Sequence, residues 1–297
     1  MTGIKTQKHR DYVGVVTNTQ IWDDFALRPD DVIVNTPPKC GTTWMLNIVM
    51  MLIFGQVVPE AGGSQHAPWL DCAFRDRKAI AAFLDGLDRR RCIKSHTPMD
   101  GIPYGPDPTY VVVYRHPVDM HFSMRTHAAN MRTDWLDYMF PLDQRAGFRR
   151  FVDAPLTGSG TDDLTVASMV HHYRQAKARA AAGNVHFFHY ADLTRDLPGQ
   201  VNRLADILGY RLSDDLRDAV ADATSFNQMR KAVQDSPRRF SRDTLFNDLA
   251  DFYASGTSQK WQGRLSPADM AHYDTRIADL LPREDIAWLQ WGDAAAA

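Results

Sequence analysis

Four short runs of apolar residues along the chain have the pattern of strands that are buried on both faces. They are Val32–Val34, Arg91–Lys94, Tyr110–Tyr114 and Val185–Tyr190. These runs do not alternate between apolar and polar residues, as strands with one exposed face do. We therefore predict a parallel sheet at the centre of the protein.

Longer segments with the pattern of helices follow these runs. The expected helices are Thr42–Phe54, Val118–Ala129, Leu164–Ala182, Leu197–Leu208 and Asp214–Ala223. A strand, a loop and a helix in alternation indicate a doubly wound α/β fold with right-handed crossovers. Because no linker divides the chain, we expect one P-loop-like domain over residues 1–297, with helices on both faces of the sheet.

Two segments, residues 62–88 and 133–163, interrupt this alternation and are predicted to be excursions or lids over the edge of the sheet. Both are rich in large apolar side chains, which either line an apolar pocket or form a satellite core. These side chains are Trp69, Phe74, Phe83, Trp135, Tyr138, Met139 and Phe140.

Composition narrows the class of protein. The formal net charge of the 297 residues is −2, whereas a protein that binds nucleic acid normally has a clear basic excess, so we expect no nucleic-acid partner. The longest apolar stretch, Trp44–Phe54, is shorter than the ~20 residues that span a bilayer. Three cysteines without metal-site spacing suit a reducing compartment. We expect a cytoplasmic protein without a membrane span or a metal.

The loop after the first strand, PPKCGTTW, has the composition of an anion site. Lys39 supplies charge, and the amides of Cys40, Gly41, Thr42 and Thr43 lie where the next helix begins, at its positive end. The lysine precedes the glycine, so the loop is not the usual phosphate-binding motif of nucleotide hydrolases. A tight turn with a capping threonine is the alternative.

The loops after the second and third strands add further polar residues at the same edge. Lys94 and His96 follow the second strand, where a neutral imidazole can accept a proton from a hydroxyl. Arg115 ends the third strand, and Ser123 lies about two helical turns later, a pair suited to a terminal phosphate. The alternatives are a structural histidine and an ion pair between Arg115 and Asp119.

Three strand ends thus supply a cation, and a convincing pair of carboxylates for a metal ion is missing. The acidic residue after the fourth strand, Asp192, is better explained as a helix cap than as a metal ligand. A multiply anionic nucleotide neutralised by side chains and amides fits this set. A sulfuryl group carries less charge than a γ-phosphoryl group, so its transfer can proceed with such donors and without Mg²⁺.

Five segments in series resemble motifs of the cytosolic sulfotransferases that use 3′-phosphoadenosine 5′-phosphosulfate (PAPS). The order and spacing of these motifs agree over most of the chain. The segments are Thr36–Trp44 (TPPKCGTTW), Lys94–Pro98 (KSHTP), Val111–Ser123 (VVVYRHPVDMHFS), Tyr190–Leu193 (YADL) and Thr224–Met229 (TSFNQM).

The resemblance implies a role for each matched residue. His96 is implied as the general base, Lys94 as the residue that stabilises the sulfonyl oxygens, and Lys39 as the shield of the leaving phosphate. The other residues implied in binding PAPS are Cys40, Gly41, Thr42 and Thr43 at the 5′ end, Trp44, Tyr190, Thr224 and Phe226 around the adenosine, Arg115 and Ser123 at the 3′-phosphate, and Gly256 in the C-terminal motif.

One departure from the family pattern bears on the donor. The C-terminal motif of the family carries Arg and Lys for the 3′-phosphate, and this chain has Ala254 and Ser255 there. Each charge-assisted contact is typically worth about 1.5–3 kcal/mol, so another basic residue is needed to compensate. Lys231, Arg238 and Arg239 are candidates by their position in the sequence.

The sequence thus predicts a sulfotransferase that uses PAPS, without a metal, to modify a hydroxyl of a small-molecule acceptor. Two alternatives stay open at this point. One is a phosphotransferase of the P-loop kinase kind, and the other is a non-catalytic nucleotide-binding relative, which the loss of the basic pair would suit. The identity of the acceptor and the oligomeric state cannot be read from the sequence.

Overall fold

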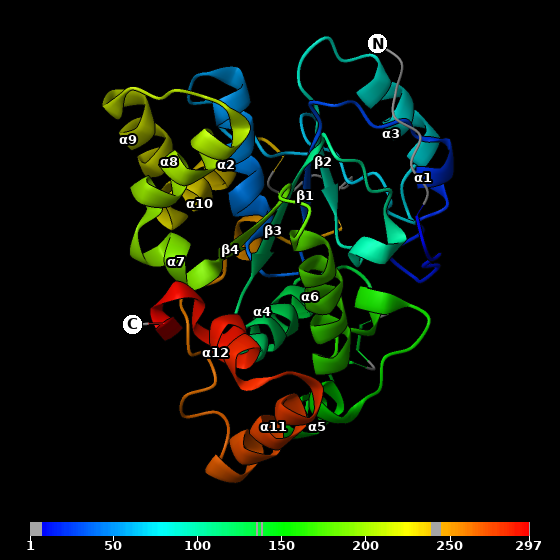
Figure 1. Cartoon of the computed structure of the whole chain (residues 1–297). Coiled ribbons are helices and arrows are strands. Elements are labelled where there is room, and N and C mark those ends of the chain that lie inside the picture. Colours follow the sequence, from blue (N-terminus) through cyan, green and yellow to red (C-terminus); the bar gives the residue numbers. More distant parts are fainter. Residues whose placement is uncertain (1–7, 135, 138, 239–244, 297) are drawn as a thin grey trace.

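A parallel sheet forms the centre of the protein. The computed structural model describes residues 8–134, 136–137, 139–238 and 245–296. In this part of the chain the sheet has four strands in the order β2-β1-β3-β4, and all neighbours run parallel (Figure 1). The strands are β1 (Val32–Asn35), β2 (Cys92–Ser95), β3 (Thr109–Tyr114) and β4 (Val185–His189). They match the four predicted strands to within one residue at either end.

The order of the strands determines where a ligand site forms. Val34 of β1 pairs with Lys94 of β2 on one side and with Val111 of β3 on the other. The chain passes from β1 outward to β2 and then returns across β1 to β3, so connections leave β1 and β3 in opposite directions. The crevice at such a reversal, beyond the carboxyl ends of the strands, is where α/β sheets bind ligands.

Helices cover both faces of the sheet, as predicted. On one face lie α2 (Thr42–Phe54), α8 (Leu197–Leu208) and α9 (Asp214–Ala223), whose bounds agree with the sequence prediction (Figure 1). The other face is covered by α4 (Pro117–Ala129) and α6 (Val166–Ala180), with a further layer of helices beyond them. This layer consists of α5 (Gln144–Asp153) and α11 (Pro267–Leu280), whereas Trp288 of α12 (Arg283–Trp291) packs directly on Tyr114 of β3 and Phe187 of β4.

The sequence pattern did not predict the remaining helices. Three of them are short, namely α1 (Ile21–Asp24), α3 (Arg77–Asp85) and α7 (Tyr190–Arg195), and α10 (Phe226–Asp235) lies beside α9. No helix in the described part of the chain is long and apolar enough to cross a bilayer.

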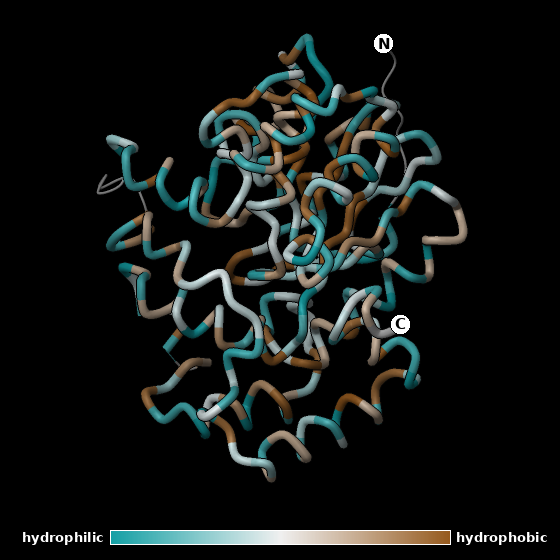
Figure 2. The backbone as a smooth tube through the Cα atoms, turned by 90° about the vertical axis from the view of Figure 1, so that its left-hand side faces the viewer, coloured by the Kyte–Doolittle hydropathy of each residue, from teal (hydrophilic) through white to brown (hydrophobic). Residues whose placement is uncertain are grey.

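The side chains of each strand divide between two hydrophobic cores. Val111 and Val113 of β3 pack with α2, α8 and α9, whereas Tyr110, Val112 and Tyr114 pack with α4 and α6. Figure 2 shows the hydrophobic stretches mostly inside the fold and the hydrophilic ones on the outer loops and helices. Burial on both faces explains why the strands read as continuous apolar runs. The carboxyl ends of the strands are left to carry polar side chains.

Candidate active site

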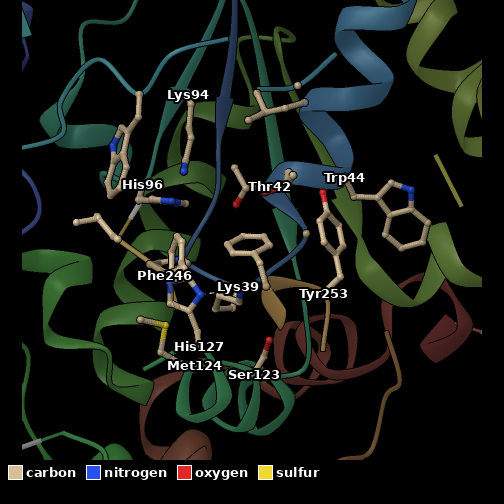
Figure 3. Close-up of a pocket in the computed structure, with 18 of the residues that line it drawn as sticks. Lys39, Thr42, Trp44, Lys94, His96, Ser123, Met124, His127, Phe246 and Tyr253 are labelled. Carbon is tan, nitrogen blue, oxygen red and sulfur yellow. Dashed lines mark hydrogen bonds between the residues drawn. The ribbon is translucent and has the colours of Figure 1, made fainter. Parts of the chain in front are cut away.

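A cavity of about 620 Å³ lies beyond the carboxyl ends of the strands. The loops after β1, β2, β3 and β4 all contribute to its wall, through Lys39, Lys94, His96, Arg115 and Tyr190. Figure 3 shows Lys94 and His96 on one side of this cavity, Trp44 on the opposite side, and Lys39 between them. The sheet therefore brings together the strand-end residues that the sequence singled out.

The loop after β1 has the geometry of an anion cradle. Lys39 and Gly41 adopt left-handed backbone conformations, with φ values of 63° and 107°, and a Cβ on Gly41 would lie 3.3 Å from Tyr190 Cδ2. Glycine is the residue that tolerates this turn at low cost. Helix α2 begins at Thr42, whose hydroxyl bonds that of Thr36, and no described side chain caps its first turn. Its free amides and positive end face the cavity.

Lys39 lies among cations and aromatic rings. Its Nζ atom is 3.2 Å from Nδ1 of His127 and 3.7 Å from the centre of the Phe252 ring (Figure 3). Burial, followed by the charges of Lys260 and Arg115, lowers the pKa of Lys39 to about 7. The environment of this ammonium group therefore favours an added anion.

The ring of His96 has a defined orientation and tautomer. Its Nδ1 atom lies 2.6 Å from the carbonyl oxygen of Thr36, which can only accept, so Nδ1 carries the proton. The Nε2 atom of the neutral ring is then an acceptor. The ring packs edge-on against Trp69 at 4.7 Å, and burial, followed by the charge of Lys94, lowers the pKa of His96 well below its ordinary value. This histidine is neutral near pH 7 and suited to act as a base.

Lys94 reaches the cavity from the end of β2. Its Nζ atom lies 4.4 Å from the centre of the Trp69 ring, and burial lowers its pKa to about 8. The ammonium and the imidazole of His96 thus share one wall of the cavity (Figure 3).

A buried carboxylate holds this wall in place. Asp71 is fully buried and accepts hydrogen bonds from Ser95 at 2.7 Å and Thr97 at 2.8 Å. It also accepts from the indole nitrogens of Trp22 at 2.9 Å and Trp69 at 2.6 Å. Asp71 therefore fixes the loop after β2 relative to the segment over residues 62–88, although nothing in the sequence pattern identified it.

Arg115 lies at the end of β3 with its guanidinium over the ring of Tyr190, at 4.0 Å from the ring centre. One of its terminal nitrogens donates to the carbonyl oxygen of Thr257 at 2.6 Å. Its Nε atom is buried and has no hydrogen-bond partner among the described residues. A buried hydrogen-bond donor without a partner is unusual, and an anionic ligand would supply the missing acceptor.

The alternative role for Arg115, an ion pair with Asp119, does not occur among the described residues. Both oxygens of Asp119 instead accept backbone N–H groups, from Gln259 at 2.9 Å and from Lys260 at 2.8 Å. Asp119 therefore anchors the segment over residues 252–261 beside Arg115.

Most of the residues assigned to the donor by resemblance line the cavity. Besides Lys39 and Arg115 they include Gly41, Thr42, Thr43, Trp44, Ser123, Tyr190, Phe226 and Gly256. Two assigned residues do not line it. Thr224 is fully buried and donates its hydroxyl to Val220, and the amide of buried Cys40 donates to Pro37.

The large side chains of the two excursions divide between cavity and core. Trp69 and Phe74 line the cavity, whereas Phe83 is exposed and does not. Met139 is buried in the main core and Phe140 packs against that core. Trp135 and Tyr138 lie outside the described residues.

Two interpretations of charged residues are corrected by the structure. Asp192 does not cap a helix but lies within α7, where it pairs with Arg195 and accepts the amide of Asp293. Lys231 does not compensate for the lost basic pair, because it pairs with Asp235 on the exposed face of α10.

Several cavity residues were not identified from the sequence. His127 follows Ser123 by one helical turn, a spacing that could have indicated the same face of α4. Lys260 lines the cavity shortly after Ala254 and Ser255 in the sequence, at a position to which the sequence analysis assigned no role. Phe246 and Phe252 pack around His127 at ring distances of 4.8 and 5.3 Å, and no local signal pointed to these contacts.

The family model described as the sulfotransferase domain matches residues 29–284. A glycolipid sulfotransferase of Mycobacterium bovis is 30% identical to the chain over 95% of its length and 94% of the relative's. A glycolipid sulfotransferase of Mycobacterium tuberculosis has the same identity and coverage. Human sulfotransferase 1E1 is 23% identical over 85% of each chain.

Solved structures share the fold. Mouse sulfotransferase SULT7A1, complexed with PAP, superposes with a TM-score of 0.73 at 17% identity and 97% coverage of both chains. Retinol dehydratase, in complex with androsterone and the inactive cofactor PAP, gives a TM-score of 0.69 at 19% identity. This superposition covers 89% of the present chain and 83% of the retinol dehydratase chain.

Proposed function

The chain belongs to the sulfotransferase domain family, and on that premise we propose that it moves a sulfuryl group from PAPS to a hydroxyl of an apolar acceptor. The observation that carries the proposal is the cavity in which two cationic side chains and a neutral histidine meet. Lys39 and Arg115 supply positive charge, and His96 presents an unprotonated nitrogen.

The residues present fit a donor with two separate anionic groups. The amides of Thr42 and Thr43 at the start of α2, with Lys39, would hold the 5′-phosphosulfate. Arg115, whose Nε atom has no partner within the described part of the chain, and Ser123 would hold the 3′-phosphate. The same cavity is also lined by Trp44, Tyr190 and Phe226, and these aromatic side chains would take the adenine.

Structural relatives support the same donor. Mouse SULT7A1 and retinol dehydratase, which share the fold, were solved with PAP. PAPS would supply an activated sulfuryl group, and all positive charge around it would come from the protein. No cluster of three or more metal-binding side chains occurs among the described residues. Independence of Mg²⁺ is part of the proposal and is tested below.

His96 would begin the reaction by accepting the proton of the acceptor hydroxyl on Nε2. The hydrogen bond from Nδ1 to Thr36 keeps Nε2 unprotonated and orients the ring. The acceptor oxygen forms its bond to sulfur as the bond from sulfur to the 5′-phosphate oxygen breaks, and adenosine 3′,5′-bisphosphate leaves. Lys94 would stabilise the charge on the sulfonyl oxygens, and Lys39 the charge on the leaving phosphate.

The acceptor would be an apolar alcohol or a lipid-like hydroxyl compound. Trp69 contacts His96, and the apolar side chains that also line the cavity include Phe74, Met124, Leu136, Leu164 and Phe246. Such a wall favours an apolar body with one hydroxyl near the base. Two mycobacterial relatives are named glycolipid sulfotransferases, and retinol dehydratase was solved with androsterone and with retinol.

A cytoplasmic location and a single domain over residues 1–297 complete the proposal. All three cysteines are buried and free, which suits a reducing compartment.

Calorimetric titration and an assay of transfer together test this function. We expect micromolar binding of adenosine 3′,5′-bisphosphate, unchanged by removal of Mg²⁺, and weaker binding of adenosine 5′-phosphate. We also expect sulfated product from PAPS and a panel of apolar alcohols. Tighter binding of Mg-ATP than of the bisphosphate would instead indicate a phosphotransferase. Binding without product over the whole panel would indicate a non-catalytic relative.

A further inference from the structure

The wall of the cavity next to Arg115 lacks the two basic residues that the family pattern places there. Ala254 and Ser255 occupy these positions, and both line the cavity. The Ser255 hydroxyl lies 3.0 Å from that of Thr257, so it adds a neutral polar group and no charge. A 3′-phosphate in this part of the cavity therefore needs a cation from another position.

Lys260 lies on the same wall, in the segment that Arg115 and Asp119 hold in place. Asp119 accepts the backbone amide of Lys260 at 2.8 Å and that of Gln259 at 2.9 Å. Arg115 donates to the carbonyl oxygen of Thr257 in the same segment at 2.6 Å. Gln259 has a left-handed φ of 58°, which turns the chain immediately before Lys260. The position of Lys260 is thus determined by the residue that would bind the 3′-phosphate and by the first turn of α4.

Among the described residues the ammonium of Lys260 forms no ion pair, and the nearby carboxylate of Asp119, whose charge partly offsets the lowering of the Lys260 pKa, accepts backbone amides instead. The ammonium also has no hydrogen-bond partner in the part of the chain that the structure describes, and it is partly buried. Burial, followed by the charge of Arg115, lowers the pKa of Lys260 to about 8. After burial, the charges of Lys260 and Arg115 are also the largest causes of the lowered pKa of Lys39. Three cations therefore converge on one region of the cavity.

We propose that Lys260 replaces the missing basic pair and binds the 3′-phosphate of the donor together with Arg115 and Ser123. This inference rests on the proposed function, because it assigns a residue to a group of the same donor. It also explains how the cavity can discriminate a bisphosphate from a monophosphate with Ala254 and Ser255 at the family's basic positions.

The other candidate cations do not fit this role. Lys231 is exposed and pairs with Asp235, and Arg238 is exposed and does not line the cavity. Arg239 lies outside the described residues.

The test is a titration of wild type and Lys260→Met with adenosine 3′,5′-bisphosphate and with adenosine 5′-phosphate. Methionine keeps the unbranched stem and removes the charge. We expect the bisphosphate to bind roughly 10- to 100-fold more weakly to Lys260→Met, because one charge-assisted contact to phosphate is lost. The monophosphate is expected to change less than about threefold, which also reports that the fold is intact. Lys231→Met is the matched control and is expected to behave as wild type.

The outcomes separate this inference from the proposed function. If wild type prefers the bisphosphate and Lys260→Met retains the same preference, Lys260 does not bind the 3′-phosphate and the function stands. If wild type shows no preference for the bisphosphate, the proposed donor is wrong and the inference falls with it.

A rescue experiment tests whether Lys260 takes the place of the missing basic pair. Ala254→Arg and Ser255→Lys, introduced together into Lys260→Met, restore the basic pair of the family on the same wall. We expect the preference for the bisphosphate to recover by at least about fivefold. A combined variant that binds no better than Lys260→Met would overturn the claim that Lys260 takes the place of this pair.

Discussion

The Nζ atom of Lys39 lies 3.2 Å from Nδ1 of His127. An ammonium group can only donate, so Nδ1 of His127 is an unprotonated acceptor. Burial, followed by the charge of Lys39, lowers the pKa of His127 well below its ordinary value, which agrees with a neutral ring. In the absence of a ligand Lys39 is therefore held by a neutral partner among other cations. An anionic donor offers it a stronger partner.

Binding of the bisphosphate is expected to take up protons at pH 8. The pKa of Lys39 is lowered to about 7 and that of Lys260 to about 8, so the free protein holds a share of neutral lysine at this pH. Phosphate groups raise both pKa values and return the missing protons, whereas the second pKa of a phosphate monoester is about 6 and releases none. Affinity should therefore fall by on the order of 10²–10³-fold from pH 7 to 9, if both lysines are fully protonated in the complex.

Calorimetry at pH 8 in two buffers of different ionisation enthalpy measures this uptake. Lys39→Gln removes one of the two titrating groups and should take up fewer protons per ligand bound. A binding enthalpy that does not depend on the buffer would contradict the prediction.

Replacement of the base is expected to lower turnover and to spare donor binding. His96→Ala should reduce kcat by about 10²–10⁴-fold, the usual contribution of a general base. Because its lowered pKa keeps His96 neutral down to acidic pH, the activity of wild type should show no loss from protonation of this residue between about pH 6 and 8. His272→Ala, at an exposed histidine that contacts Asp153, is the control. A decrease in kcat of less than tenfold would rule out His96 as the base.

Asp71→Asn is expected to destabilise the protein and to loosen the wall that carries Lys94 and His96. The carboxylate accepts four side-chain hydrogen bonds, and an amide of the same shape has a single acceptor oxygen. The free energy of unfolding should fall by about 1–3 kcal/mol, because buried donors are left without partners. Denaturant unfolding measures this, with exposed Asp88→Asn as the control. Equal stability of the two variants would contradict the role of Asp71.

Gly256→Ala is expected to weaken donor binding through Phe226. Gly256 has a φ of 63°, and an added Cβ would lie 2.6 Å from Phe226 Cδ2, so the ring must move at the wall of the cavity. Gly209→Ala is the matched control, because Gly209 has a φ of 75° and nothing within 4 Å of the added Cβ. Both variants should lose roughly 1 kcal/mol of stability to backbone strain.

Titration with adenosine 3′,5′-bisphosphate distinguishes the two glycine variants. Only Gly256→Ala should bind it more weakly, by several-fold. Similar affinities for both variants would mean that Phe226 does not form part of the adenosine pocket.

Strands and helices were predictable from the sequence where the hydrophobic pattern of one short segment was enough to identify them. The apolar runs identified β1 to β4 because strands covered on both faces need no polar positions. Helix α2 was predicted with its observed bounds, from Thr42 to Phe54. The helices that the pattern missed, such as α5 and α11, pack on the outer layer, outside the strand–loop–helix alternation on which the prediction rested.

Charged residues were predicted less well than elements, because a charge has many possible partners. Aspartate is a residue type that commonly caps helices, but Asp192 lies inside α7. It accepts a hydrogen bond from the backbone amide of Asp293, about a hundred positions away. An ion pair of Arg115 with Asp119 was plausible because the two residues lie close together in the sequence. In the structure Asp119 instead accepts hydrogen bonds from the backbone amides of Gln259 and Lys260.

By itself, the sequence determined the parallel α/β fold and the convergence of Lys39, Lys94, His96 and Arg115. Parallel strands end at one edge, so residues that follow them meet there whatever the rest of the chain does. Only the tertiary structure decided that Asp71 supports the loop of His96, that His127 contacts Lys39, and that Lys260 lines the same cavity as Arg115. These partners come from distant segments, and their contacts depend on packing that no local pattern records.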